Sequence, residues 1–79
     1  MVTITSVVPQ EDYKLYLTFS DGKKGVFDVE SHLDRGIFLE LRNPSLFKSV
    51  YIMDEFTIAW ANGADLCPDC VYAETKFVN

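Results

Sequence analysis

The segment 13–19, Y-K-L-Y-L-T-F, alternates between residues suited to a core and residues suited to water. This period of two is typical of a half-buried β-strand. An Asp-Gly pair follows after Ser20 and predicts a hairpin. A two-residue loop would pair Leu15 with Asp28 and place a carboxylate on the apolar face. A three-residue loop with Gly22 in the left-handed region pairs Leu15 with Phe27, so we expect this bulged hairpin.

The remaining segments predict further strands and short helices. Runs of β-branched and aromatic residues predict strands at 2–8, 50–53 and 56–60. We expect an antiparallel sheet of about five strands, built from an N-terminal and a C-terminal hairpin. Asn43-Pro44 suits the start of one short helix, and Pro68 suits the first position of the last one. The segment 37–42 is ambiguous between helix and strand. The chain is thus expected to be a single α+β domain, residues 1–79.

The composition indicates a small acidic domain with a packed core. Its 79 residues include seven Lys and Arg against twelve Asp and Glu, which gives a net charge of −5. Binding to the phosphate backbone of a nucleic acid needs clustered cations, whereas the basic residues of this chain are scattered along the sequence. We therefore do not expect nucleic-acid binding by this domain alone. No apolar run approaches the ~18 residues of a membrane span, and the N-terminus lacks the features of a signal peptide. We therefore expect a cytoplasmic protein that does not enter a membrane.

The segment 60–70, W-A-N-G-A-D-L-C-P-D-C, concentrates the residues that could carry chemistry. Cys67 and Cys70 form a C-x-x-C pair, and a helix N-terminus favours a reactive thiolate. Asp65 and Asp69 oppose that effect, and no βαβ unit precedes the motif. A metal site needs three or four ligands, whereas the one histidine lies in a separate segment. We expect no metal site or cofactor, and a thiol-redox protein using both cysteines is kept as an alternative.

The same segment has structural explanations. Asn62 suits the turn of the Asn-Gly pair, and we expect Asp65 to accept N–H groups from that turn and from the next helix. Trp60 suits a core or edge anchor, and aromatic residues are also favoured at interface centres. An exposed cluster of Trp60, Tyr51 and Tyr72 would form a binding patch. The residues expected to contact a partner are Trp60, Asn62, Asp65, Asp69 and Tyr72.

The chain shows no convergent catalytic set in its sequence. His32 as a general base would need a nucleophile and an orienting acid, and the serine beside it has the wrong geometry, so we expect an exposed polar residue. The acidic pairs Glu11-Asp12 and Asp54-Glu55 are sequential and fall in predicted loops. Paired catalytic carboxylates converge from different elements instead. We therefore expect no enzymatic activity.

Nearly the whole chain carries a pattern of spaced Gly, Pro and aromatic residues. The pattern is an N-terminal hairpin, a Gly-x-Phe…Leu segment, an x-Pro-x-x-Phe turn and a closing Trp-Pro-Asn-Gly-x-Asp-hydrophobic-x-Pro-Glu. Its positions here are Gly36, Phe38, Leu41, Pro44, Phe47, Trp60, Asn62, Gly63, Asp65, Leu66, Pro68 and Asp69. In this the chain resembles the small bacterial domain-of-unknown-function family 2442. Ala61 departs from the family's Pro, and Asp69 replaces its Glu with the same charge.

The resemblance implies a fold and little chemistry, since no activity is established for the family. Members are often encoded beside another small protein, in pairs that look like toxin–antitoxin modules, and some carry a C-terminal helix-turn-helix. We therefore expect an antitoxin-like or adaptor module that binds another protein, with the adjacent-gene product as the candidate partner. The acidic surface of the module would cover a basic site on that partner. One alternative is an autoregulatory nucleic-acid-binding protein with Lys14, Lys23 and Lys24 on one sheet face. An exposed sheet edge could also form a homodimer.

Overall fold

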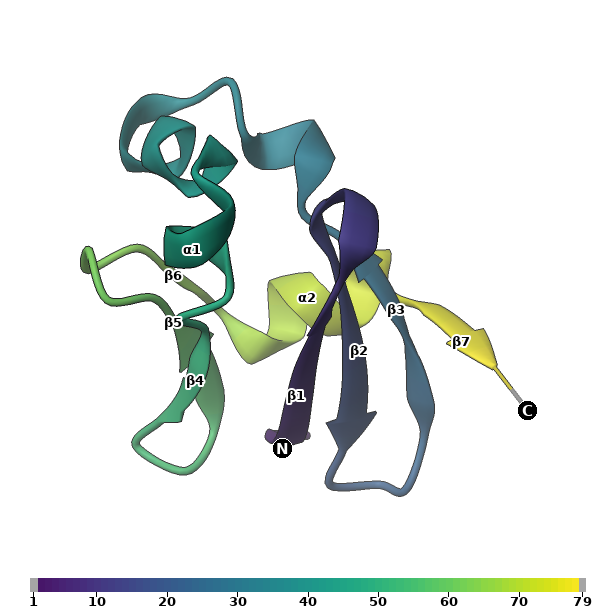
Figure 1. Cartoon of the computed structure of the whole chain (residues 1–79). Helices are drawn as coiled ribbons and strands as arrows, with labels where there is room; N and C mark the ends of the chain where they lie inside the picture. Colours follow the sequence, from purple (N-terminus) through teal and green to yellow (C-terminus); the bar gives the residue numbers. More distant parts are fainter. Residues whose placement is uncertain (1, 79) are drawn as a thin grey trace.

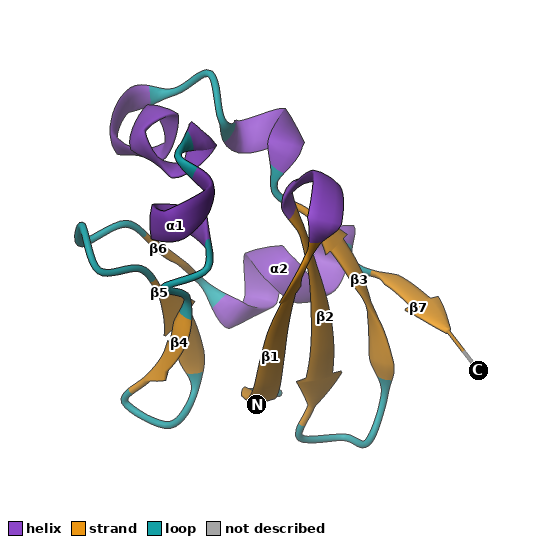
Figure 2. Ribbon diagram, viewed as in Figure 1, coloured by secondary structure: helices purple, strands orange, loops and turns teal. Residues whose placement is uncertain are grey.

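The computed structural model describes residues 2–78, which form two antiparallel sheets and several short helices (Figure 1, Figure 2). The larger sheet has the order β1-β2-β3-β7 and consists of β1 (Ile4–Gln10), β2 (Lys14–Phe19), β3 (Lys24–Asp28) and β7 (Lys76–Val78). The smaller sheet has the order β4-β5-β6 and consists of β4 (Tyr51–Met53), β5 (Thr57–Ala59) and β6 (Asp65–Leu66). The α-helices are α1 (Pro44–Phe47) and α2 (Pro68–Glu74). The 3-10 helices are η1 (Glu11–Tyr13), η2 (Glu30–His32) and η3 (Gly36–Arg42).

The α+β class predicted from the sequence is confirmed, but the strands divide between two sheets instead of forming one. The two predicted hairpins lie in separate sheets, and each sheet gains one strand that was not predicted. These strands, β6 and β7, are too short to show an alternating pattern, and they pair with β5 and β3. The first strand also runs past its predicted end, through Pro9 to Gln10. This is tolerated because β1 lies at the edge of the larger sheet, where a missing N–H need not break a ladder.

The predicted register of the first hairpin is confirmed. Leu15 lies opposite Phe27 in the β2–β3 ladder, and Gly22 has a φ of +88° in the loop. That left-handed conformation carries little strain in glycine. The side chain of Asp21 accepts a hydrogen bond from the backbone N–H of Lys23 at 3.0 Å, which stabilises the turn. The second predicted hairpin is also present, as β4 and β5 pair across a turn.

One core lies between the two sheets and α2. Figure 1 shows α2 behind the larger sheet, on the side away from the viewer. The inward residues of β2, namely Leu15, Leu17 and Phe19, are buried together with Phe27 of β3 and Val71 of α2. The alternate residues of these strands point to the opposite side, as the period of two requires. The N–H of Ile4 donates to the Phe56 carbonyl at 3.0 Å, which ties the edge of β1 to the smaller sheet.

The pairing of β3 with β7 depends on Gly25, which lies opposite Phe77. A Cβ at Gly25 would lie 2.6 Å from the carbonyl oxygen of Lys76 and 2.6 Å from Cγ2 of Thr75. A side chain at this position would therefore collide with the incoming backbone. Glycine in a strand commonly marks such a close approach. The residue thus explains how a three-residue C-terminal strand can join the larger sheet.

The helix starts follow the predicted chemistry. The side chain of Asn43 accepts a hydrogen bond from the N–H of Ser45 at 3.0 Å, and Pro44 occupies the first position of α1. Pro68 begins α2, as predicted. The ambiguous segment 37–42 is part of the 3-10 helix η3, in which Leu41 is buried in the core.

Candidate interaction site

Trp60 is an internal residue, which confirms its interpretation as a core anchor, whereas its alternative role as an exposed partner contact is wrong. Its side chain is 1% exposed, and its indole N–H donates to the carbonyl of Phe47 at 2.9 Å. The ring meets Phe38 edge-on, with 6.2 Å between centroids. A buried indole needs such a partner for its N–H. The predicted exposed cluster with Tyr51 and Tyr72 is therefore wrong, because Trp60 contributes nothing to the surface.

The side chain of Asn62 links the Asn-Gly turn to η3 by hydrogen bonds. Its Oδ1 accepts from the N–H of Ala64 at 3.1 Å, which confirms the predicted turn role. Its Nδ2 donates to the carbonyl of Ile37 at 3.3 Å and to Oε1 of Glu40 at 3.1 Å. Both the oxygen and the nitrogen of the side-chain amide therefore have hydrogen-bond partners within the chain. Asn62 is therefore a positioning residue for the fold, and its role as a partner contact stays a prediction.

The capping role predicted for Asp65 is wrong for the described residues 2–78. Asp65 is exposed in β6, opposite Ala59, and its carboxylate has no hydrogen-bond partner within that range. The segment that precedes α2 is extended from β6 through Cys67, and Asp65 lies in the strand rather than in a helix cap. Asp69 is exposed in the first turn of α2, where negative charge suits a helix start.

Tyr72 ties α2 to the first hairpin. Its hydroxyl donates to Oδ2 of Asp21 at 2.8 Å, and its ring packs edge-on against Phe19 with 4.9 Å between centroids. The N–H of Lys23 and then the Tyr72 hydroxyl lower the pKa of the Asp21 carboxyl below its ordinary value. Lys23 also lies over the Tyr72 ring, with its Nζ 5.9 Å from the centroid. Tyr72 is half-buried in these contacts.

The cysteines are exposed free thiols at the start of α2. The nearby Cys67 raises the pKa of the Cys70 thiol most, and Asp69 and Glu74 add to the effect. A raised thiol pKa lowers the thiolate fraction and disfavours thiol exchange. His32 is partly buried rather than exposed, and its Nε2 lies 3.1 Å from Oε1 of Glu74. Across residues 2–78, no group of three or more His, Cys, Asp and Glu residues is placed to hold a metal ion.

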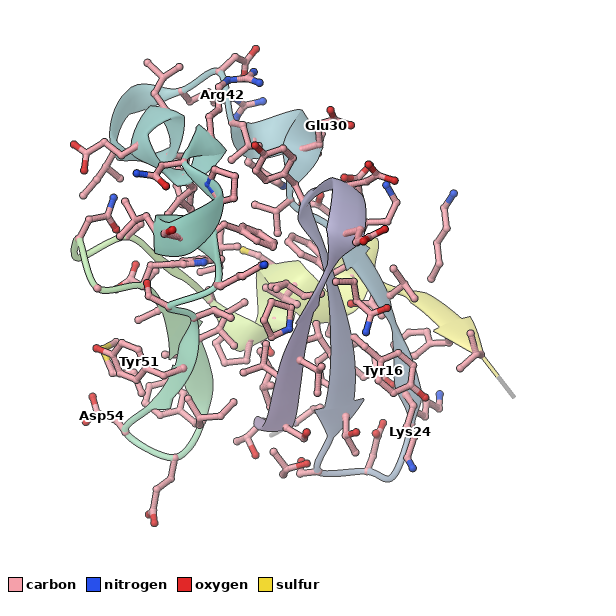
Figure 3. The ribbon with its side chains drawn as sticks, in the orientation of Figure 1. Tyr16, Lys24, Glu30, Arg42, Tyr51 and Asp54 are labelled. Carbon is pink, nitrogen blue, oxygen red and sulfur yellow. The ribbon has the colours of Figure 1, made fainter. Side chains whose placement is uncertain are left out.

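The outer face of the larger sheet, meaning the face opposite α2, forms a grid of three rows set by the strand register. The first row is Gln10, Lys14 and Asp28. The second row is Val8, Tyr16, Val26 and Lys76. The third row is Ser6, Thr18, Lys24 and Val78. Figure 3 shows Tyr16 and Lys24 on the side of the sheet turned toward the viewer, away from α2.

This outer face combines apolar surface with positive charge. Val8 is 46% exposed and Val78 is 49% exposed, while Tyr16 and Val26 are half-buried. Three of the chain's seven basic residues lie on the grid, namely Lys14, Lys24 and Lys76. Asp28 is the one acidic residue among the grid positions named above. The face is thus locally basic, with a formal charge of about +2 on a chain of −5.

Alternation alone could have identified half of the outer face, because Tyr16 and Val26 are outward positions of the predicted hairpin. Lys76 and Val78 could not be assigned to it, since β7 was not predicted. Lys14 and Lys24 share the face, as the nucleic-acid alternative required, but Lys23 lies in the hairpin turn against aromatic rings.

Two cavities of about 250 Å³ each open elsewhere on the described surface. One is lined by η1 and α1, including Glu11, Tyr13 and Phe47. The other lies beside β6 and includes Asp65 and Cys67. Sites for drug-sized ligands usually span roughly 300–1,000 Å³. Each cavity is therefore slightly smaller than a typical site for a drug-sized ligand.

None of the helices in residues 2–78 has the length and apolar character that a membrane crossing requires. No curated protein and no solved structure matches the chain. The family described as "Protein of unknown function (DUF2442)" matches residues 4–77, which is nearly the whole chain. The resemblance carried by the Gly, Pro and aromatic pattern is confirmed by this match. The chain therefore belongs to the family of proteins of unknown function DUF2442.

Proposed function

We propose that this chain is a protein-binding module without catalytic activity, and that it binds its partner through the outer face of the larger sheet. The observation that carries the proposal is the uncovered row of Val8, Tyr16 and Val26 across three adjacent strands. Within residues 2–78, the helix that packs on this sheet covers the opposite face. Contiguous apolar surface rimmed by polar residues marks interaction sites in soluble proteins.

The partner is proposed to be the product of an adjacent gene, in an antitoxin-like or adaptor role in the cytoplasm. This part of the proposal is supported by the gene pairs that family membership implies. The sign of the charge expected on the partner's contact surface changes. The sequence suggested an acidic surface against a basic partner, but the outer face is itself locally basic. An acidic contact surface on the partner suits it better.

The test is co-expression of the tagged chain with the adjacent-gene product, followed by light scattering to measure the mass of the complex. Val8→Asp places a charge at the β1 end of the apolar row and should weaken the complex at least about tenfold. Leu39→Asp is the matched control, because Leu39 is 51% exposed on η3, away from the outer face. Absence of any complex at micromolar concentration would count against the proposal, as would equal loss from both variants.

Nucleic-acid binding is a second candidate, favoured by the placement of Lys14 and Lys24 on one face beside Tyr16. The net charge of −5 opposes it, since a polyanion is repelled on average. The test is a mobility shift of the chain's own promoter fragment across a salt series. Phosphate contacts require affinity to fall steeply with salt. No shift, or a shift that does not depend on salt, removes this candidate.

A further inference from the structure

We infer that the outer face docks an amphipathic helix of the partner, with an apolar stripe flanked by Asp and Glu. The inference rests on the proposed function and specifies the chemistry of the partner. Val8, Tyr16 and Val26 lie directly opposite one another on β1, β2 and β3. With strands about 4.8 Å apart, this row spans roughly 10 Å, about the length of two turns of an α-helix that lies along it, across the strands.

A helix suits this face better than an added strand. A strand pairs with the edge of a sheet through backbone groups, whereas the outer face presents side chains. The same sheet already packs a helix on its other side, where Val71 of α2 is buried against the inward residues of β2 and β3. A second helix would cover Tyr16 and Val26 in the same manner and complete a three-layer arrangement.

The lysines set the charge of the partner. On β2, Lys14 lies in the row on one side of Tyr16. On β3, Lys24 lies in the row on the other side of Val26. Lys76 lies directly opposite Val26 on β7. Neighbours on one face are about 5–7 Å apart, so all three ammonium groups lie within reach of a ligand on the apolar row. Carboxylates along the margins of a helix would meet these cations.

Two other occupants fit the outer face less well. A second copy of this chain in a two-fold arrangement would bring together two faces of the same net positive charge, since an isologous contact uses the same patch twice. Single-stranded nucleic acid is bound by successive aromatic rings, whereas the apolar row offers one ring, Tyr16, between two valines. An acidic helix satisfies both the apolar row and its basic rim.

The direct test titrates the full chain with two synthetic helical peptides of about 18 residues. Both have the same leucine stripe, and the stripe is flanked by Glu in one and by Lys in the other. We expect the Glu peptide to bind at least about tenfold more tightly, with NMR amide shifts confined to β1, β2, β3 and β7. Equal affinity, shifts centred elsewhere, or tighter binding of an oligo(dT) probe to the same face would overturn the inference.

A charge-reversal pair separates this inference from the proposed function. Lys24→Glu should weaken the binding of the Glu peptide and of the adjacent-gene product about tenfold. Lys48→Glu should change neither affinity. Lys48 is exposed beside the cavity at α1, outside the outer face. Circular dichroism melts verify that both variants fold. If the complex forms and Lys24→Glu leaves it unchanged, the inference fails while the proposed function stands. If the unmodified chain forms no complex, the proposed function itself fails.

Discussion

The segment 60–72 and the outer face of the larger sheet use their side chains in opposite ways. The first holds the most conspicuous residues of the chain, and its aromatic and amide groups are engaged internally: Trp60 with Phe47, Asn62 with η3, and Tyr72 with Asp21. The second is built from ordinary alternating positions, yet it presents the uncovered apolar row. A distinctive sequence motif therefore marks a constrained backbone here, while the surface suited to a partner is inconspicuous in sequence.

The largest effect is expected for Trp60→Ala, which removes an internal side chain of the segment 60–72. Because the indole is 1% exposed and its N–H is bonded, its loss should lower the free energy of unfolding by about 3–5 kcal/mol. Tyr51→Ala is the control, as Tyr51 is 47% exposed, and should change it by no more than about 0.5 kcal/mol. Urea denaturation measures both. Similar losses in the two variants would mean that Trp60 is not the internal anchor described.

Gly25→Val tests whether β7 belongs to the outer face. The new Cβ would meet the Lys76 carbonyl at 2.6 Å, so β7 should detach and the free energy of unfolding should fall by about 1–3 kcal/mol. Hydrogen exchange should show loss of protection at residues 76–78. Val26→Ala changes the adjacent outward position and should leave that protection intact. Retained protection in Gly25→Val would contradict the close approach.

Asn62→Ala compares the engaged side chain with its exposed neighbour. Three hydrogen bonds are lost, and we expect a destabilisation of about 1–2 kcal/mol, measured by thermal unfolding. Asp65→Ala removes an exposed carboxylate and should change the free energy of unfolding by no more than about 0.5 kcal/mol. A larger effect from Asp65→Ala than from Asn62→Ala would restore the capping role that the structure does not show.

The Tyr72–Asp21 contact has a pH signature. Since the folded chain lowers the pKa of Asp21, its carboxylate stabilises the fold above the unfolded pKa, and this contribution is lost as pH falls through the folded pKa. Tyr72→Phe removes one of the donors, so the Asp21 pKa should rise toward its ordinary value while remaining lowered by the Lys23 N–H. NMR titration of the carboxyl carbon measures it. An unchanged Asp21 pKa would mean that the hydroxyl is not bonded in solution.

The smallest effect is expected at the cysteines. Because Cys67 is the leading cause of the raised Cys70 pKa, Cys67→Ser should lower that pKa and shift Cys70 alkylation by iodoacetamide to lower pH. Mass spectrometry across a pH series follows the modified fraction. In the unmodified chain, alkylation of Cys70 should lag behind that of an ordinary thiol. Rapid alkylation of Cys70 near neutral pH would instead favour the thiol-redox alternative.

Local patterns in the sequence determined much of this protein. Alternation and an Asp-Gly turn set the first hairpin and its register, and Asn43, Pro44 and Pro68 set the helix starts, because these features depend on backbone geometry within a few residues. The tertiary structure alone decided the division into two sheets and the docking of β7 on Gly25, and it selected the core over an interface for Trp60. These depend on contacts between segments distant in the chain, which short-range spacing does not encode. The outer face depends on both kinds of contact. The strands of its first hairpin were predicted from the sequence, but Lys76 joins the face only because β7 pairs with β3.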